Sequence, residues 1–392
     1  MDACKNLAQA DTEAETLANV IGGVDAPTGR YLGVQAFLAA RSEVKVTPRI
    51  LIAPGFTHQR LANQPEAASA EQTLTFSGDA LQLMGVGVTD LTVTSPDKTV
   101  AYAEDTDYTL DAARGVVTRL AEGSIPDGGA VVCAYRYARP PSRPLSNPVV
   151  AEMMGVAERL RGIIVADGPN ANDAAAIDYR EDWGSPRVYV VDPWVKVMRD
   201  GAVVYEPASA RVAGLIAKID NDKGFWWSPS SNVLNGVLGT HRAVDFALGD
   251  AGARANYLNE NEVSTIIQED GYRLWGNRTC SSDPKWAFLS VRRTADMINE
   301  SLLQAHLWAV DRNITKTYVE DVTEGVNAYL RQLKAKGAIL GGRCRVDPDL
   351  NDAASIADGK IYFDFDFTPP YPAEHVTFRS RMVNDYIEEI FK

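Results

Sequence analysis

The chain has 392 residues, of which 45% are hydrophobic and 23% charged, and it carries a formal net charge of -13 with a pI of about 4.9. This length predicts two or three domains with a sizeable core, and the aromatic content argues against disorder. An acidic surface repels nucleic-acid phosphates and anionic lipids, so we expect no nucleic-acid partner. No apolar run reaches the length of a membrane helix, so we expect no membrane insertion.

Cysteine and histidine residues are too few and too scattered to predict a metal site. The four cysteines, Cys4, Cys133, Cys280 and Cys344, lie far apart without a C-x-x-C pair. Their spacing argues against a structural zinc site and a disulfide-dense secreted domain, and we expect reduced thiols. The four histidines show no metal-ligand spacing, and neither common phosphate-binding glycine loop is present. We therefore expect no metal and no cofactor.

The first sixty residues predict two helical segments and a buried strand. Glu13–Val20 reads as a short helix, and the apolar helical pattern resumes at Tyr31–Ala40 after a loop rich in glycine and proline. Arg49–Pro54 is a short apolar run that ends in Pro-Gly. Such a run is typical of a buried strand in an α/β sheet.

From about residue 72 to 137 the pattern changes to short alternating runs separated by turn residues. Examples are Thr73–Phe76, Leu91–Thr94 and Val131–Tyr137. Frequent short strands with such turns predict a small antiparallel β-sandwich. Arg139–Pro144, which is rich in proline, then predicts a stiff linker.

After this linker, helical and strand patterns alternate again. They predict helices at Pro148–Leu160 and Ala171–Trp183, and strands at Gly162–Ala166 and Arg187–Val191. We expect the strand near Arg49 to share one sheet with the strand that begins at Gly162. The β-rich segment is then an insertion in a loop of an α/β domain, because loops tolerate insertions at a modest entropic cost.

The C-terminal part predicts two amphipathic helices and a strand of strict period two. The helices are Asp296–Val310 and Thr323–Lys336, and the strand is Ile361–Phe367. Four apolar side chains line one face of this strand, namely Ile361, Phe363, Phe365 and Phe367. Tyr362, Asp364 and Asp366 line the other face.

Few residues suggest catalysis. Asp364 and Asp366 share a strand face and could hold a divalent cation or act as an acid–base pair, but a solvated polar face is the favoured interpretation. His306, beside Trp308, is better explained as a packed or interfacial histidine than as a base. The run from Asp270 to Thr279 is rich in tyrosine, tryptophan and arginine, which anchor protein interfaces.

That run belongs to a longer block, Leu258–Ala309, which resembles the sheath proteins of contractile phage tails, including those of R-type pyocins. The family pattern is "LNe-gV-t-I-r-dGyrlWGnRT", followed by a helix that opens "RTAD-I". The matching positions are Leu258, Asn259, Glu260, Val263, Ile266, Asp270, Gly271, Tyr272, Trp275, Gly276, Asn277, Arg278, Thr279, Arg293, Thr294, Ala295 and Asp296. Ser231–Val237 and Gly359–Thr368 resemble neighbouring family segments, and residues 17–60 and 148–220 match more loosely.

The chain departs from the family pattern in two ways. The β-rich segment is similar to immunoglobulin-like insertions of larger sheath proteins. The extended N-terminal arm that the family carries before the helix at Glu13 is not found. For this reason we expect the chain as given to be mainly monomeric.

The resemblance implies a mixed α/β, or α+β, multidomain fold: a phage tail sheath fold with an inserted all-β, immunoglobulin-like sandwich. Residues 1–69 with 141–215 would form an α/β sheath domain, and residues 70–140 the inserted domain on the outer surface. Residues 216–392 would form a C-terminal α+β domain that ends in an arm at 376–392. The tail is also compatible with a docked helix over Arg379–Phe391, and both interpretations stay open.

The resemblance also implies a structural subunit, not an enzyme, that polymerises around an inner tube and contracts to drive it through a cell envelope. Its partners would be further copies in a helical sheath, the tail tube protein, the baseplate and the tail terminator. It would reside in the virion tail after assembly in the host bacterial cytoplasm. The alternatives are another tail or baseplate structural protein, or a carbohydrate-binding protein that uses the β insertion.

Subunit contacts are expected in three places. The expected residues are Tyr272, Arg273, Trp275, Asn277 and Arg278 in the block, Ile361, Phe363, Phe365 and Phe367 in the late strand, and Phe378, Tyr386 and Ile390 in the tail.

Overall fold

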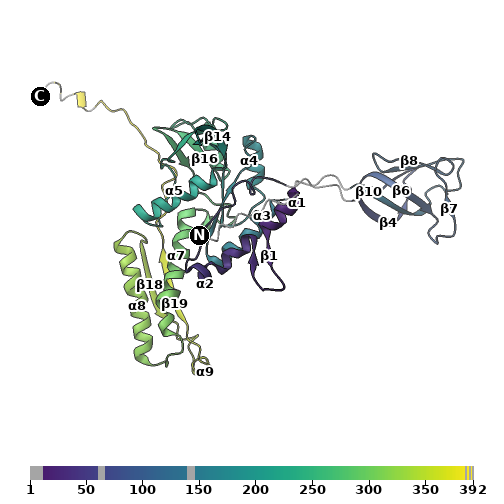
Figure 1. Cartoon of the computed structure of the whole chain (residues 1–392). Coiled ribbons are helices and arrows are strands. Elements are labelled where there is room, and N and C mark those ends of the chain that lie inside the picture. The colour runs from purple at the N-terminus through teal and green to yellow at the C-terminus, as the bar shows by residue number, and fades with distance from the viewer. Residues whose placement is uncertain (1–11, 61–66, 139–145, 385, 388–389, 391–392) are drawn as a thin grey trace. The chain divides into compact units, whose positions relative to one another are not determined.

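The computed structural model describes residues 12–60, 67–138, 146–384, 386–387 and 390 (Figure 1). The chain divides into two compact units. Unit 1 comprises Met1–Gln59 and Asn147–Lys392, and unit 2 comprises Arg60–Ser146. The linker expected at Arg139–Pro144 and the segment before residue 12 lie outside the described residues.

Unit 1 is built around a five-stranded sheet of order β17-β16-β12-β11-β3. Its strands are β3 (Ile50–Leu51), β11 (Ile163–Asp167), β12 (Val188–Val191), β16 (Val263–Gln268) and β17 (Tyr272–Trp275). The first four are parallel, and β17 runs antiparallel to β16. The expected pairing is confirmed, because Ile163 lies opposite Ile50. The sheet joins strands from both sides of the domain boundary expected at residue 215, since β12 pairs with β16.

Helices cover both faces of this sheet. On one face lie α1 (Glu13–Ile21), α3 (Pro148–Leu160), α4 (Asp173–Arg180) and α6 (Arg254–Glu260), with Ile164 and Ala166 of β11 turned toward them. On the other face lie α5 (Ser209–Asp222) and the start of α7 (Leu289–Ala305), with Ile163 and Val165 turned toward them. Every residue of β11 and β12 is buried, as the continuous apolar runs predict.

Asn147 lies where the chain re-enters unit 1, and it contacts the segment where the chain leaves unit 1. Its side-chain oxygen accepts a hydrogen bond from the Val150 amide and caps α3. Its side-chain nitrogen donates to the carbonyl oxygens of Phe56 and Gln59, at 2.9 and 2.8 Å. The chain therefore leaves and re-enters unit 1 at adjacent points, which an inserted unit requires.

Unit 2 consists of two antiparallel sheets around one core. One sheet has the order β4-β10-β6-β7 and the other the order β5-β9-β8. The strands are β4 (Ala67–Thr75), β5 (Ala80–Gln82), β6 (Val86–Thr94), β7 (Ala101–Tyr102), β8 (Tyr108–Asp111), β9 (Val116–Arg119) and β10 (Ala130–Ala138). Side chains from both sheets share the core, among them Leu81, Val93, Val117 and Tyr135. Kinship with immunoglobulin domains stays a prediction.

Four small elements of unit 1 were not anticipated in this form. A 3-10 helix, Gly33–Ala39, and the short α2 (Ala40–Val44) replace the expected helix from Tyr31. The backbone at Gly33 has φ +58°, and a Cβ there would lie 2.4 Å from the Val20 carbonyl oxygen, so no regular helix runs through this position from Tyr31. The strands β1 (Gly23–Val24) and β2 (Tyr31–Leu32) form a hairpin in front of it.

A second unpredicted feature is a three-stranded sheet of order β14-β13-β15. Its strands are β13 (Val195–Arg199), β14 (Ala202–Glu206) and β15 (Val237–Thr240). All three pair antiparallel, and Val195 and Val197 face the core beneath α5.

The C-terminal part of unit 1 pairs two helices with a two-stranded sheet. After α7 follow a 3-10 turn (Leu307–Ala309), α8 (Lys316–Ala335), β18 (Gly341–Val346), α9 (Ala353–Ala357) and β19 (Phe363–Thr368). Both long helices begin earlier than predicted. Thr315 caps α8 through the Tyr318 amide, ahead of the apolar stripe that carried the prediction. No helix among the described residues is long and apolar enough to span a membrane.

The late strand is shorter than predicted, and the tail is extended. The side chain of Asn351 binds both the amide and the carbonyl of Tyr362, at 2.8 Å each, so β19 begins only at Phe363. Residues 369–384 contain no helix or strand. Residues 379–384 therefore do not form the docked helix considered for Arg379–Phe391, whereas residues 386, 387 and 390 have 3-10 helical backbone.

Candidate assembly surfaces

The hairpin β16–β17 forms one edge of the central sheet and carries three of the expected contact residues. Tyr272 packs partly against the core beneath α5. Arg273 donates from Nε to the Glu269 carbonyl at 2.6 Å and from Nη1 to the Ser231 carbonyl at 2.8 Å. The ring of Trp275 meets Phe246 edge to face, with 4.8 Å between centroids. All three have partners in their own chain and keep part of their surface accessible.

Asn277 is turned inward. Its side chain is buried, and its Nδ2 donates to Ser290 Oγ at 3.1 Å. Its carbonyl accepts from the Leu289 amide at 2.8 Å, so Asn277 holds the first turn of α7. Burial leaves this side chain unavailable to a partner, in contrast to the contact role that the sequence suggested.

Arg278 binds the root of the tail. Its Nε and Nη2 donate to the two carboxylate oxygens of Glu374, at 2.8 and 2.6 Å. Its guanidinium lies 5.1 Å from the ring centroid of Phe288, which in turn meets Tyr371 edge to face at 6.2 Å. The hydrogen bond to Glu374 raises the pKa of Arg278. We call this arrangement the tail clamp. Glu374 gives no local sequence signal, because it lies far from Arg278 along the chain.

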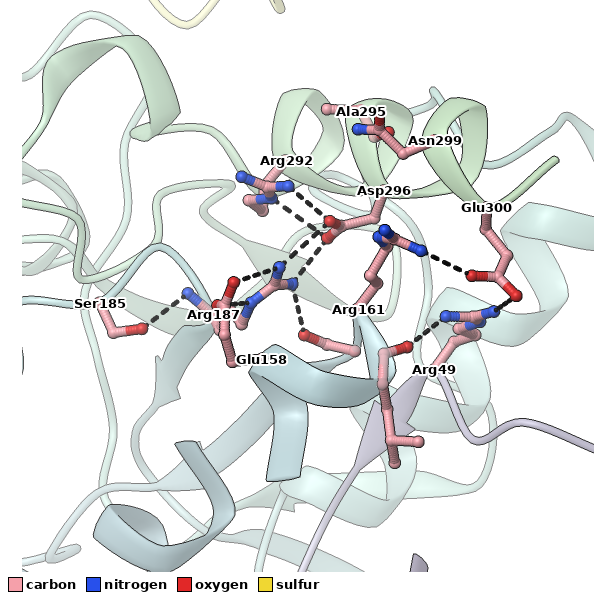
Figure 2. Close-up of polar contacts among 12 residues, drawn as sticks. Arg49, Glu158, Arg161, Ser185, Arg187, Arg292, Ala295, Asp296, Asn299 and Glu300 are labelled. Carbon is pink, nitrogen blue, oxygen red and sulfur yellow. Dashed lines mark hydrogen bonds and ion pairs between the residues drawn. The ribbon is translucent and has the colours of Figure 1, made fainter. Parts of the chain in front are cut away.

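A buried ion-pair network joins α7 to α3 and the central sheet, as Figure 2 shows. Arg187 precedes β12 and donates to Asp296 of α7 at 2.8 Å and to Glu158 of α3 at 2.5 Å. Asp296 also accepts from Arg292. The side chains of Arg187 and Asp296 are each 4% exposed. Burial alone would lower the pKa of Arg187, but its hydrogen bonds to Glu158 and Asp296 outweigh burial and raise it.

One helical turn further along α7, Glu300 continues this network. It accepts from Arg161 at 2.9 Å and lies 3.0 Å from Arg49, next to β3 (Figure 2). The sequence identified Asp296 only as a position of the family pattern, and no local feature marked Glu300. The network links α7, in the C-terminal half of unit 1, to α3 and to the residues that precede β3 and β12.

The sheet β18–β19 places the expected aromatic residues on one face. Phe363, Phe365 and Phe367 pack partly against the cluster between α7 and α8, while Ile361 lies just before β19. Asp366, on the other face, pairs with Arg345 at 3.2 Å. Among the described residues, no group of three or more histidines, cysteines, aspartates or glutamates could hold a metal ion.

The tail exposes large apolar side chains. The exposed fraction is 92% for Phe378, 70% for Tyr386 and 76% for Ile390. Burying an aromatic side chain stabilises a protein by about 2 kcal/mol relative to leaving it in water. An extended segment that leaves several such groups in solvent is typical of a segment that docks on another surface.

The carboxyl ends of β11 and β12 hold two buried acids where α/β enzymes often place a site. Burial raises the pKa of Asp167 to about 6, although Ser209 donates to it from both its amide and its hydroxyl. Asp192 accepts from Arg242 and from the Asn170 amide. Each carboxylate thus accepts hydrogen bonds from groups of its own chain.

Two protein-family models match the chain. The model for the phage tail sheath protein central domain matches residues 137–280, and the model for the phage tail sheath C-terminal domain matches residues 281–382. Together they cover residues 137–382, which include the tail clamp, Asp296 and Glu300 of the ion-pair network, and the sheet β18–β19.

Several relatives are tail sheath proteins. A prophage major tail sheath protein of Pseudomonas aeruginosa is 47% identical over 252 residues, which are 64% of this chain and 65% of the relative. The tail sheath protein of Escherichia phage P2 is 40% identical over 217 residues, 54% of each chain. That of Burkholderia phage BcepMu is 31% identical over 348 residues, covering 73% of this chain and 72% of the relative. The chain thus spans less than two thirds of the first two relatives.

Solved structures with a similar fold come from contractile injection systems. A chain in the anti-feeding prophage baseplate matches with a TM-score of 0.52 and 24% identity, over 60% of this chain and 64% of that one. A chain in the contracted PVC sheath complex matches with a TM-score of 0.52 and 20% identity, over 61% and 69%. These likenesses confirm the predicted fold class, a mixed α/β multidomain fold of the sheath type.

Proposed function

Because the chain belongs to the phage tail sheath family, we propose that it is a structural subunit of a contractile tail sheath. In this role it polymerises around an inner tube and contracts to drive the tube through the envelope of a target cell. The observation that carries the proposal is the combination, in one chain, of an extended apolar tail and a two-stranded sheet with an unpaired edge.

The tail and the sheet support assembly by strand addition. A strand from a neighbouring subunit extends the sheet through main-chain hydrogen bonds, which hold while the subunits rotate. Head-to-tail contacts that do not close on themselves generate a helical tube. Each copy both donates a tail and offers a sheet, so one sequence suffices for the whole lattice.

The network around Asp296 supports a contraction in which subunits move as rigid bodies. Contraction then rearranges the lattice between two packings, with the driving free energy stored during assembly. Such a mechanism needs no nucleotide and no catalytic residue. The two buried acids at the sheet end, Asp167 and Asp192, fit this view because both are satisfied internally.

The proposed partners are further copies of the chain, the tail tube protein, the baseplate and the tail terminator. The proposed location is the tail of a virion or a phage-like particle, reached after assembly in the host bacterial cytoplasm. We place unit 2 on the outer surface of the sheath, because a unit of this size on the inner side would obstruct the tube.

Negative-stain electron microscopy of the protein, produced together with a tail tube protein, tests the proposal. Striated tubes or contracted rings are the expected result. The matched sample lacks residues 376–392 and should yield single subunits or short stacks. A protein that stays monomeric in the presence of the tube protein would contradict the proposal.

A further inference from the structure

We infer that Arg278 serves assembly from within its own chain: through Glu374 it fixes the point at which the tail leaves unit 1. In this role Arg278 is a positioning residue and does not bind a partner subunit. The role rests on the proposed sheath function and identifies one residue on which that function depends. It differs from the subunit contact that the sequence suggested for Arg278.

The tail follows a strand that is bound to α8. β19 pairs with β18 along its whole length, and its phenylalanines pack on the cluster between α7 and α8. Asn327 of α8 binds the other edge of β18, where its Oδ1 accepts from the Cys344 amide at 2.8 Å and its Nδ2 donates to the Cys344 carbonyl at 3.1 Å. The two strands and α8 therefore form one part of unit 1, which lies together in Figure 1.

Arg278 belongs to a different part of unit 1, next to the central sheet. It forms an antiparallel bridge with Phe288, just before α7. Two residues further on, the Cys280 amide donates to the carbonyl of Val188 in β12, at 2.9 Å. The backbone of Arg278 is thus held between β12 and the start of α7, which fixes the position from which its side chain extends.

The segment from residue 369 to 374 connects these two parts, and it is attached along its length. Pro369 is buried. The ring of Tyr371 meets Phe288 edge to face, with 6.2 Å between centroids. Glu374 accepts hydrogen bonds of 2.8 and 2.6 Å from the guanidinium of Arg278. The root of the tail therefore follows the central sheet, although the strand before it belongs to the α8 part.

The attachment ends at Glu374. Every residue from 375 to 384 is exposed, as are residues 386, 387 and 390. Among the described residues, no hydrogen bond joins 375–384 to the rest of unit 1. Because two parallel hydrogen bonds between a guanidinium and a carboxylate fix direction as well as position, the pair of Arg278 and Glu374 sets where the exposed tail starts and which way it points.

A fixed starting point favours assembly in two ways. A tail held at its root loses less conformational freedom when it docks than a tail that is free from residue 370 onward. Every copy also presents its tail at the same place relative to the central sheet, which a regular helical lattice requires. A partner that bound Arg278 directly would first have to displace Glu374 and the ring of Phe288, 5.1 Å from the guanidinium.

Limited proteolysis of the full chain tests whether Arg278 holds the tail. A glutamyl endopeptidase cuts after glutamate, and Glu374 must leave Arg278 before it can enter the protease. In Arg278→Ala, cleavage between Glu374 and His375 should be about tenfold faster than in the unmodified protein. Trypsin cleavage after Arg379, which is exposed beyond the clamp, should keep its rate. Equal rates of cleavage after Glu374 in the two proteins would overturn the inference.

Assembly of the chain with a tail tube protein, followed by light scattering and negative-stain microscopy, tests the positioning role. Arg278→Ala and Glu374→Gln should each raise the protein concentration needed for tubes by about tenfold. The exchanged pair, Arg278→Glu with Glu374→Arg, restores the internal contact in reverse and should recover most of this loss. A direct contact between Arg278 and a partner predicts the opposite, because the exchanged pair would then assemble no better than Arg278→Ala.

The matched control is Arg114→Ala, which removes an exposed arginine paired with Asp111 in unit 2 and should assemble like the unmodified protein. Urea unfolding, followed by tryptophan fluorescence, reports whether each variant is folded. Glu374→Gln alters only an exposed side chain, so it remains informative if Arg278→Ala folds poorly.

Two assembly results would overturn the inference. One is unchanged tube formation by Glu374→Gln, and the other is an exchanged pair that recovers nothing. Absence of tubes from the unmodified protein would instead overturn the proposed sheath function, while the cleavage experiment would still decide whether Arg278 holds the tail.

Discussion

The central sheet of unit 1 and its sheet β18–β19 differ in how far a single chain completes them. In the central sheet, β11 and β12 are buried throughout, helices cover both faces, and the buried acids have internal partners. The sheet β18–β19 has two strands, one edge closed by Asn327 and one without a partner among the described residues. A two-stranded sheet is marginally stable by itself and gains from added strands.

This difference separates folding from assembly within one unit. Substitutions in the central sheet and its ion-pair network should change the stability of the single chain. Substitutions in the tail should leave that stability unchanged and affect association. All seven tryptophans lie outside residues 60–146, so their fluorescence follows the unfolding of unit 1 alone.

The largest expected effect is that of Asp296→Ala. The substitution removes the buried carboxylate that Arg187 binds and leaves it only the exposed Glu158, and breaking a buried pair costs about 3–5 kcal/mol. Urea denaturation followed by tryptophan fluorescence measures the change. The control is Glu320→Ala, which removes an exposed pair with Lys316 on α8 and should cost less than about 0.5 kcal/mol. Equal losses in the two variants would show that α7 does not depend on the network.

The second prediction concerns the pH dependence of stability. The pKa of Asp167 is about 6 in the folded chain and 3.8 ordinarily, so between these values the folded chain holds a proton that the unfolded chain has lost. Stability from this group is therefore full below pH 4 and lost as pH rises through 6, by about 3 kcal/mol at most. Asp167→Asn should remove this slope, as denaturation at pH 4, 5, 6 and 7 would reveal. Parallel curves for the two proteins would contradict the assignment.

A smaller effect is expected when unit 2 is removed. Gln59 and Asn147 are adjacent through a hydrogen bond of 2.8 Å, so a short Gly-Ser linker can replace residues 60–146. The free energy of unfolding of unit 1 should change by no more than about 1 kcal/mol. Loss of cooperative unfolding in the shortened chain would mean that unit 1 depends on unit 2 for its stability.

The smallest change in stability is expected for Phe378→Ser, because this side chain is 92% exposed. Its free energy of unfolding should stay within about 0.5 kcal/mol of the unmodified value. Tube formation should nevertheless fall, since the apolar face of the tail loses its largest group. A variant that assembles normally would limit the tail contribution to main-chain hydrogen bonds.

The elements that the sequence predicted best are those with the strongest local pattern. The continuous apolar runs at β11 and β12 and the period-two run at β19 were recognised because burial imposes a regular spacing of apolar side chains. The strand β18 was missed, since Gly341-Gly342-Arg343 shows no such spacing. Among the candidate contacts, Arg278 was identified but Glu374 was not, and Asn277 proved to be buried.

The sequence by itself determined the family, through the block Leu258–Ala309, and the class of fold, through the alternation of helical and strand patterns. Only the tertiary structure decided which groups are satisfied within the chain and which are left for a partner. Asn327 and Cys344, or Arg278 and Glu374, are ordinary residues in the sequence, and folding brings them together. Hydrogen bonds between residues distant along the chain produce no periodic pattern in the sequence. Such bonds nevertheless decide which backbone groups at a sheet edge already have a partner.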